Sequence, residues 1–266
     1  MRCDEIRIEL ENLAPEDIAC SWDNPGLLAG RAGKEVHTIY LALDADDQVV
    51  EDAVREGADL LITHHPLIFK AVKKINDEDF IGRRLLKLIQ ADISYYAMHT
   101  NFDSAPGCMA DLAAKRAGLA EGSDILEPEG EVDGVAYGIG RVGSLERPMT
   151  LRELAGHVKK EFGLPFVTVY GDLDSDAAVG LCAVSPGSGS SMIGAALSWG
   201  ADVLITGDIG HHEGIDSLAR GMAVIDAGHY GLEHIFMDFM EGYLKKRLEE
   251  PVRIIKAPIR FPAAVL

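Results

Sequence analysis

Histidine is concentrated at a few places in this 266-residue chain, and those places share one feature. Each lies within about six residues of the end of a short apolar run that predicts a buried strand. The histidines concerned are His64, His65, His99, His211, His212 and His229. In open α/β sheets, ligands bind beyond the carboxyl ends of the strands. The sequence therefore predicts an imidazole-rich site at such an edge.

Two of these histidines are followed, four residues later, by a carboxylate. His99 precedes Asp103 and His229 precedes Glu233, at matching places in the two halves of the chain. Imidazole and carboxylate together suit Zn, Mn, Fe, Co or Ni. No thiolate accompanies them, so the pattern favours neither an iron–sulfur cluster nor a structural zinc knuckle. We expect the adjacent His64 and His65 to complete a pocket of imidazoles with two carboxylates.

The neighbours His64 and His65 can share one site only if the chain leaves the sheet there. Adjacent strand residues point to opposite faces, and Pro66 favours such an exit. One ion would then take His64 and a second ion His65, with a carboxylate bridging them as in two-metal hydrolytic sites. Singly, each motif is more typical of an ordinary strand-end loop, and only their joint occurrence favours a metal site. His37 and His157 lie outside the pattern and are interpreted as surface or packing residues.

An internal repeat explains how the two halves carry matching pairs. Residues 57–63 read GADLLIT and residues 200–206 read GADVLIT. Each copy predicts a strand, preceded by a strand and a helix and followed by a helix and a strand. The predicted strands are 39–43 and 93–98 in the first half and 179–184 and 222–226 in the second; the predicted helices are 46–56, 80–90, 190–199 and 214–220.

This alternation predicts parallel βαβ units with right-handed crossovers. The expected fold class is α/β, with two related lobes of mostly parallel or mixed sheets. A pseudo-twofold axis between the two lobes would bring the two histidine–carboxylate pairs together, with the metal site between the lobes.

The domain boundaries are expected at an acidic stretch rich in Gly and Pro. Residues 1–120 would form the first lobe, 121–134 a linker and 135–266 the second lobe. The second lobe would include strands at 135–142 and 166–170 and a helix at 151–162, for which Thr150 and Glu153 form a capping box. A C-terminal helix (232–250) and strand (252–256) are placed so that they can pack back on the first lobe.

Composition and charge exclude several classes of protein. Hydrophobic residues make up 47% and charged residues 26%, as in globular proteins rather than disordered or fibrous ones. The net charge of −18 makes nucleic acid and anionic membranes unlikely partners, and the basic pairs Lys73-Lys74 and Arg83-Arg84 are interpreted as solvated faces. Four scattered cysteines, a charged N-terminal segment and the lack of a membrane-length apolar run indicate a cytoplasmic protein.

Several motifs follow one another along the chain: HHP at 64–66, HTNFD at 99–103 and GHYGLE at 228–233. WDNPGLLAG at 22–30, GIGRVG at 138–143 and TGD at 206–208 agree with them. In this order the motifs resemble those of the Nif-three-like family, whose members are often named GTP cyclohydrolase I type-two homologues. The resemblance runs from about Ile18 to the C-terminus.

The resemblance implies a centre of two divalent metal ions. Carried over residue by residue, its ligands are His64, His65, Asp103, His229 and Glu233. His99 would sit beside them as a catalytic group that shuttles a proton, or as an occasional ligand. The resemblance also implies two α/β lobes and a toroidal homohexamer, a trimer of dimers with metal sites facing the interior. The 121–134 segment is too short for the extra domain inserted in some relatives.

Two functions remain open at this point. The first is a metal-dependent hydrolase of a nucleotide or another phosphorylated or cyclic-amide metabolite. The family's name implies ring opening of GTP, although nothing in the sequence specifies guanine recognition. The second is a non-enzymatic metal-binding, storage or regulatory hexamer. Five ligands shared by two ions leave coordination positions open, which favours catalysis.

Four further features have alternative interpretations. PGSGSS at 186–191 is either a phosphate contact or, more often, a tight strand-to-helix turn, and Pro186 lacks a backbone donor. The 22–30 segment is a structural loop in preference to a substrate lid. Asp44 is expected to be a helix N-cap. His211 and His212 are placed in a loop, where they are candidates for substrate or supporting contacts.

Overall fold

The computed structural model describes residues 1–266, which divide into two compact units. Unit 1 is Met1–Phe102 with Phe236–Ile259, and unit 2 is Asp103–Ile235 with Arg260–Leu266. The division after Phe102 lies earlier than the predicted boundary at residue 120, whereas α10 (Ile235–Arg247) and β11 (Arg253–Lys256) belong with unit 1, as the expected return of the C-terminal helix and strand to the first lobe allows.

Unit 1 is built on a mixed sheet in the order β1-β4-β3-β2-β11. Its strands are β1 (Gly26–Ala29), β2 (Thr38–Ala42), β3 (Leu60–Thr63), β4 (Ser94–Ala97) and β11 (Arg253–Lys256). All neighbours are parallel except β1, which pairs antiparallel with β4. β2, β3 and β4 are buried at every position, as expected of central parallel strands.

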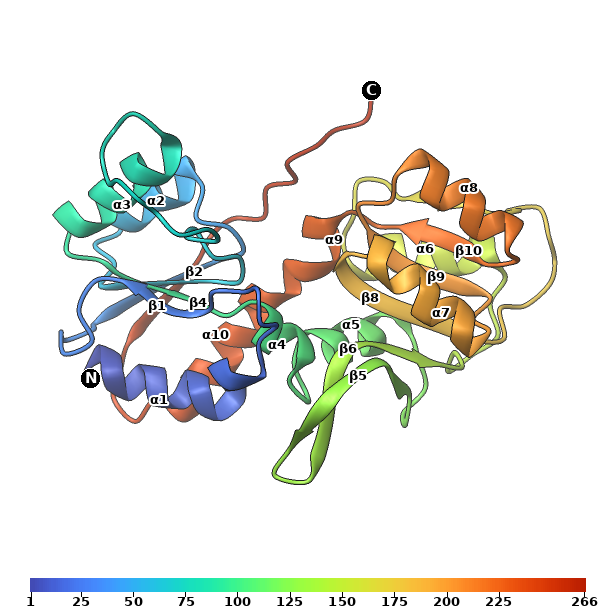
Figure 1. Cartoon of the computed structure of the whole chain (residues 1–266), viewed down its shortest axis with the longest axis horizontal. Coiled ribbons are helices and arrows are strands. Elements are labelled where there is room, and N and C mark those ends of the chain that lie inside the picture. Colours follow the sequence, from blue (N-terminus) through green and yellow to red (C-terminus); the bar gives the residue numbers. More distant parts are fainter. The chain divides into compact units, whose positions relative to one another are not determined.

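Helices cover both faces of this sheet (Figure 1). α2 (Asp47–Arg55) and α3 (Phe80–Gln90) are the crossover helices and lie on one face, and α1 (Cys3–Leu13) and α10 (Ile235–Arg247) lie on the other. η1 (Glu16–Ile18) and α4 (Thr100–Ser104) are short. α10 is tied to α1 by hydrogen bonds from Tyr243 and Arg247 to Glu9.

Unit 2 has a mixed sheet in the order β5-β6-β8-β9-β10-β7. Its strands are β5 (Asp124–Val132), β6 (Val135–Gly143), β7 (Thr168–Tyr170), β8 (Cys182–Ser188), β9 (Val203–Gly207) and β10 (Ala223–Asp226). β8, β9 and β10 are parallel, and the other pairs are antiparallel. The LIT residues of the two repeated segments lie on β3 and β9, each of which has a parallel neighbour on both sides. The predicted α/β fold with mixed sheets is therefore confirmed.

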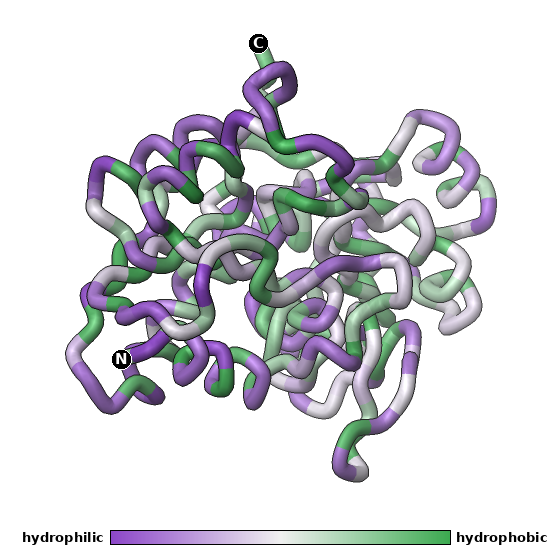
Figure 2. Tube along the Cα trace, turned by 60° about the vertical axis from the view of Figure 1, so that its left-hand side comes forward, coloured by the Kyte–Doolittle hydropathy of each residue, from purple (hydrophilic) through white to green (hydrophobic).

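α7 and α8 lie on one face of this sheet and α5 and α6 on the other (Figure 1). The helices of unit 2 are α5 (Met109–Ala117), α6 (Leu151–Glu161), η2 (Ser190–Met192), α7 (Ile193–Trp199), α8 (His211–Ala219) and α9 (His229–Glu233). The predicted capping box of Thr150 and Glu153 is present at α6. Buried apolar residues such as Leu126, Ile193 and Leu204 form the core beneath α7. In Figure 2 the helices alternate between hydrophilic and hydrophobic positions, as sheet-covering helices do.

Three predicted segments differ from the structure. Residues 121–134 do not form a linker, because β5 occupies 124–132 and pairs with β6 in a hairpin. α8 begins at His211 rather than at 214, since the side chain of Glu213 accepts the backbone N–H of Gly210 and caps the helix there. The predicted helix at 232–250 is two helices, α9 and α10. No helix has the length and apolar character needed to span a membrane.

Candidate metal centre

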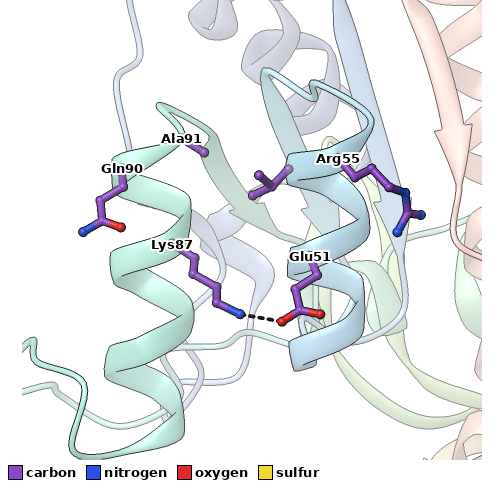
Figure 3. A pocket seen from close by; sticks show the side chains of 6 residues that line it. Glu51, Arg55, Lys87, Gln90 and Ala91 are labelled. Carbon is purple, nitrogen blue, oxygen red and sulfur yellow. Dashed lines mark hydrogen bonds and ion pairs between the residues drawn. The ribbon is translucent and has the colours of Figure 1, made fainter.

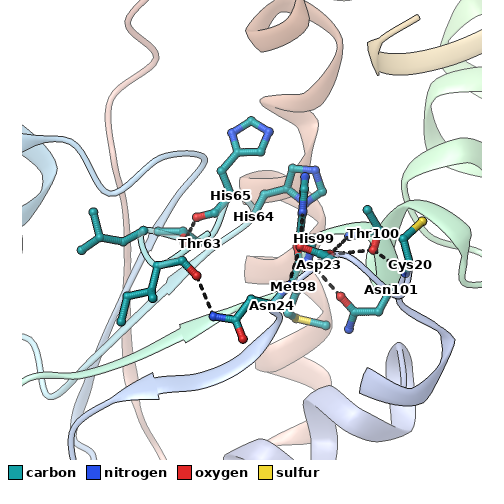
Figure 4. A network of polar contacts seen from close by, with 12 residues as sticks. Cys20, Asp23, Asn24, Thr63, His64, His65, Met98, His99, Thr100 and Asn101 are labelled. Atoms are coloured by element: carbon teal, nitrogen blue, oxygen red, sulfur yellow. Dashed lines mark hydrogen bonds and ion pairs between the residues drawn. The ribbon is translucent and has the colours of Figure 1, made fainter. Parts of the chain in front are cut away.

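Unit 1 gathers three imidazoles at the carboxyl ends of two neighbouring strands (Figure 4). β3 ends at Thr63 and is followed directly by His64 and His65; β4 ends at Ala97, two residues before His99. One ring nitrogen from each of the three lies within 4.8 Å of the others. The rings can share one place because the strand ends before His64, as expected from Pro66.

A buried hydroxyl holds the turn that carries His64 and His65. The backbone carbonyl of His65 accepts hydrogen bonds from Thr63 Oγ1 at 2.7 Å and from the Tyr95 hydroxyl at 3.0 Å. The same hydroxyl accepts the N–H of Leu67 at 2.7 Å. Burial raises the pKa of Tyr95, so the hydroxyl keeps its proton and remains a donor. Tyr95 thus connects β4 to the turn after β3.

Each imidazole of unit 1 is oriented through its Nδ1 atom. His64 Nδ1 lies 2.7 Å from the carbonyl oxygen of Met98, His65 Nδ1 lies 2.8 Å from Asp44 Oδ1, and His99 Nδ1 lies 2.8 Å from Asp23 Oδ1. A carbonyl or carboxylate oxygen accepts, so Nδ1 carries the hydrogen in each ring. Histidines that bind metals are fixed in this way, with Nε2 as the ligand atom.

Two aspartates in these pairs were not identified as site residues from the sequence. Asp44 was predicted to cap a helix, but the cap of α2 is Asp46, which accepts the N–H of Val49 at 2.7 Å. Asp44 instead orients His65. Asp23 lies within WDN, a motif that only the family resemblance singled out. No sequence spacing links either aspartate to its histidine, because each pair comes together only when the chain folds.

The Asp23 carboxylate is fully buried and heavily hydrogen-bonded. It accepts the His99 ring at Oδ1 and, at Oδ2, the N–H of Thr100 at 3.0 Å and its hydroxyl at 2.6 Å. Burial alone would raise the pKa of Asp23, but the hydrogen bonds and the charge of His99 outweigh it and lower that pKa to about 2. The 22–30 segment therefore has a structural role through Asp23, while Trp22 is 58% exposed.

Unit 2 gathers a second set of donors, with two carboxylates. His229 and Glu233 are the first and last residues of α9, and His229 Nε2 lies 3.1 Å from Glu233 Oε2. His229 Nδ1 is 2.8 Å from Asp208 Oδ2, the same orientation device as in unit 1. A carboxylate oxygen of Asp103 lies within 4.8 Å of one of Glu233. The two carboxylates expected from the sequence are thus brought together.

Glycines allow backbone to approach this donor pair closely. A Cβ on Gly187 would lie 2.6 Å from Glu233 Oε1 and 3.6 Å from His229 Nε2, and Gly187 has a φ of +76°. A Cβ on Gly207 would lie 2.4 Å from the backbone nitrogen of His229. The PGSGSS segment therefore faces a carboxylate, which argues against a phosphate contact there and for a role in shaping the donor pair.

Asp226 fixes the two loops that carry Asp208 and His229. Its carboxylate oxygens accept the N–H of Ile209 and the N–H of Gly228, each at 2.9 Å. Both loops are thereby tied to the end of β10. Sequence analysis assigned Asp226 no role, because an aspartate at a strand end has many possible partners.

α4 links the two donor sets along the chain. The helix begins directly after His99, whose carbonyl accepts the N–H of Phe102 at 2.8 Å. Asp103, the first residue of unit 2, follows on the same helical turn. His99 and Asp103 are therefore separated along the chain only by the first three residues of this helix.

Other candidate positions do not join these sets. His211 and His212 are exposed in the first turn of α8, and neither belongs to any group of side chains that could hold a metal ion. A hollow of about 480 Å³ between α2 and α3 has no imidazole, and its one carboxylate, Glu51, pairs with Lys87 at 2.6 Å (Figure 3). His37 is exposed beside Glu35.

Comparison with known proteins places the chain in a family. Residues 1–260 match the profile of Duf34/NIF3 (NGG1p interacting factor 3). A Clostridium perfringens protein named GTP cyclohydrolase 1 type 2 homolog is 34% identical over 255 residues, covering 96% of this chain and 95% of that protein. The chain belongs to the Duf34/NIF3 family. The resemblance expected from the sequence is confirmed.

Solved structures of similar proteins share the fold. Reduced HcgD from Methanocaldococcus jannaschii has 31% identity and a TM-score of 0.82, covering 96% of this chain and 97% of that chain. The Bacillus cereus protein related to NIF3 has a TM-score of 0.89 at 24% identity, covering 100% and 99% of the two chains, and supports the fold alone. As a Duf34/NIF3 protein, the chain thus combines a shared fold with donor sets that fit a metal.

Proposed function

We propose that this protein binds two divalent metal ions and uses them to hydrolyse a small metabolite. The proposed ligands are His64, His65, Asp103, His229 and Glu233. The single observation that carries the proposal is that three imidazoles in unit 1, and an imidazole and two carboxylates in unit 2, each lie within 4.8 Å of a neighbouring donor. A metal site needs several such donors close together, with each imidazole oriented by a hydrogen bond.

The donor chemistry fits Zn, Fe, Mn, Co or Ni. His64, His65 and His229 each present a ring whose Nδ1 already has an acceptor. Asp103 and Glu233 lie within 4.8 Å of each other, so that a carboxylate is available to a pair of ions. Gly187 leaves room beside Glu233 that any larger residue would fill.

Bound divalent cations would lower the pKa of a water molecule and polarise the bond to be cleaved. The chain itself supplies the proton route. His99 donates Nδ1–H to Asp23, whose low pKa keeps it ionised and fixes this tautomer. His99 Nε2 is then the atom that accepts a proton from the nucleophile and returns it to the leaving group. Asp23 acts through His99 as a positioning residue.

The proposed substrates are nucleotides, other phosphorylated metabolites or cyclic amides. The relatives' name, GTP cyclohydrolase 1 type 2 homolog, supports a ring-opening hydrolysis. We further propose a cytoplasmic, toroidal homohexamer, as the family resemblance implies. Nucleic acid is not a proposed partner, since the net charge of −18 opposes it.

Metal content and activity together test the proposal. Wild-type protein loaded with Zn²⁺ or Mn²⁺ is expected to retain about two equivalents by elemental analysis and to hydrolyse a member of a panel of nucleotides, phosphoesters and cyclic amides. Asp103→Ala and His229→Ala should lose both properties. His212→Ala, which changes an exposed histidine outside the donor sets, should keep both.

Two results would contradict the proposal in different ways. Retention of two equivalents by the Asp103→Ala, His229→Ala double variant would show that the ligands are misassigned. Metal binding that is lost in the variants, combined with no hydrolysis of any panel member, would instead favour a protein that stores or delivers metal ions. Light scattering of the same samples tests the hexamer.

A further inference from the structure

We propose that a hollow beside His229 binds a single uncharged ring of the substrate. The inference rests on the proposed function, because it assigns the ring to the molecule held at the metal ligands. The hollow lies wholly within unit 2 and has a volume of about 170 Å³. Its lining combines residues 164–166, Asp208, residues 227–231 and residues 261–263 of the C-terminal segment.

The size of the hollow limits what it can hold. An apolar cavity of about 150 Å³ is enough to bind benzene. A volume of about 170 Å³ therefore suits one five- or six-membered ring, and a whole nucleotide does not fit inside it. A larger substrate would place one ring here and keep the remainder outside.

The lining selects an apolar, planar group. Phe166, Tyr230 and Phe261 contribute aromatic rings, and Leu164 and Pro262 contribute aliphatic surface. Aromatic side chains favour flat partners, which they contact by stacking or edge to face.

The charge of the lining disfavours phosphate in the hollow itself. None of the lining residues is Lys or Arg, and the only carboxylate is Asp208, which accepts His229 Nδ1 at 2.8 Å. No lysine or arginine of the lining balances Asp208, so a phosphate is disfavoured among the aromatic rings and favoured on the side of the proposed metal ions. The ring in the hollow is therefore taken to be neutral.

His229 connects the hollow to the proposed metal ligands. The residue belongs both to this lining and to the proposed metal ligands, and its ring is oriented by Asp208. A ring in the hollow would thus hold a substituent, such as a carbonyl, next to the ligand set. Binding of the ring would therefore also orient the reacting group of the substrate toward the proposed metal ligands.

The C-terminal segment supplies one wall of the hollow. The N–H of Arg260 donates to the Tyr230 hydroxyl at 3.1 Å, and the ring centroid of Phe261 lies 5.7 Å from that of Tyr230 and 6.1 Å from that of His234. Phe261 is half-buried by these contacts, whereas Val265 is 70% exposed. Phe261 therefore anchors the wall and Val265 does not.

Two hydroxamates with the same metal-binding group test the inference. Benzohydroxamate carries a ring and acetohydroxamate does not. Titration calorimetry on the Zn²⁺-loaded full chain should show benzohydroxamate binding on the order of tenfold more tightly, because the ring buries apolar surface. Phe166→Ala and Phe261→Ala should reduce this preference to about twofold or less. Val265→Ala, on the same C-terminal segment, should keep it.

The outcomes separate this inference from the proposed function. Equal affinities for the two hydroxamates, or a preference that survives both aromatic substitutions, would overturn the ring site while leaving the metal ligands in place. A wild-type protein that binds no Zn²⁺ would overturn the proposed function and the ring site together. Phe261→Ala changes a half-buried residue of the C-terminal segment, so it remains informative if Phe166→Ala fails to fold.

Discussion

At the scale of single residues, Gly187 shows how closely the backbone approaches the donor pair of unit 2. Gly187→Ala would place a methyl group 2.6 Å from Glu233 Oε1 and force a φ of +76° on an alanine. We expect a destabilisation of about 1 kcal/mol from the backbone and, because Glu233 must move, at least about a tenfold loss of metal affinity. Calorimetric Zn²⁺ titration measures the affinity.

Gly200→Ala is the matched control. Gly200 has a φ of +73° in the same unit, but nothing lies within 4 Å of its missing Cβ. This variant should lose similar stability and keep its metal affinity. Equal metal binding by both variants would show that the space beside Glu233 is not needed.

The lowered pKa of Asp23 predicts how the free energy of unfolding depends on pH in the acid range. Its pKa is lowered from 3.8 to about 2 in the folded protein, so its ionised form stabilises the fold at every pH above about 4. That contribution, about 2 kcal/mol, is lost as the pH falls from about 4 through 2. Asp23→Asn should therefore show a shallower loss of unfolding free energy over this range, measured by urea denaturation of the metal-free protein.

The control for this measurement is Asp174→Asn, whose carboxylate is 91% exposed in its ion pair with Arg152. It should follow the wild-type acid dependence. If Asp23→Asn loses stability as steeply as wild type, the lowered pKa of Asp23 does not contribute to folding.

The candidate site was only partly predictable at this scale. His64, His65 and His99 could be found because imidazoles follow apolar strands, and the structure does bring these three together. Asp103 and Glu233 were found by their spacing, and they too lie close together. Asp23, Asp208 and Asp226 could not be assigned roles, since their partners are distant in sequence and are met only after folding.

At the scale of elements, an ion pair between a buried arginine and a half-buried aspartate joins α5 to β6. Arg141 donates to both carboxylate oxygens of Asp111, at 2.6 and 2.9 Å, and Arg141 is only 8% exposed. Arg141→Ala should cost about 2 kcal/mol of unfolding free energy, because it leaves Asp111 without its cation in a half-buried position. Urea denaturation at neutral pH measures this loss.

The exposed pair of Lys87 and Glu51 between α2 and α3 provides the comparison. Lys87→Ala should change the unfolding free energy by less than about 1 kcal/mol, because solvent screens such pairs. Similar losses in the Lys87→Ala and Arg141→Ala variants would show that burial adds nothing to the α5–β6 contact.

The sequence predicted the βαβ elements better than the antiparallel ones. α3 spans Phe80–Gln90 as predicted, because its apolar residues repeat with helical spacing and Asp79 caps it. β5 was missed because only Leu126 of its nine residues is buried, so the strand lacks the alternation that identifies a half-buried strand. Its place at the sheet edge explains that polarity.

At the scale of the whole molecule, metal removal should be visible as lost stability. A ligand that binds only the folded protein stabilises it by mass action, by about 2.7 kcal/mol at a hundredfold excess over Kd. Chelation of the Zn²⁺-loaded protein should lower its Tm by several degrees, and re-addition of Zn²⁺ should restore it. Differential scanning calorimetry measures both steps.

His64→Ala is the control for this experiment, because the residue is buried at a strand end and is a proposed ligand. Its Tm should fall less on chelation than that of the wild type, because one of the two proposed ions has lost a ligand. A wild-type protein that gives up bound Zn²⁺ with no change in Tm would show that the ions are held by surface groups rather than by the folded donor sets.

The pairing of β11 with β2 has a consequence for synthesis on the ribosome. Residues 253–256 emerge long after β2, so the nascent chain exposes one edge of a fully buried strand while unit 2 is still being made. Such an edge can pair with another polypeptide. A chain whose synthesis ends before β11 would therefore be prone to aggregation. In such a chain the contiguous stretch 103–235 could fold, but the sheet of unit 1 would lack β11.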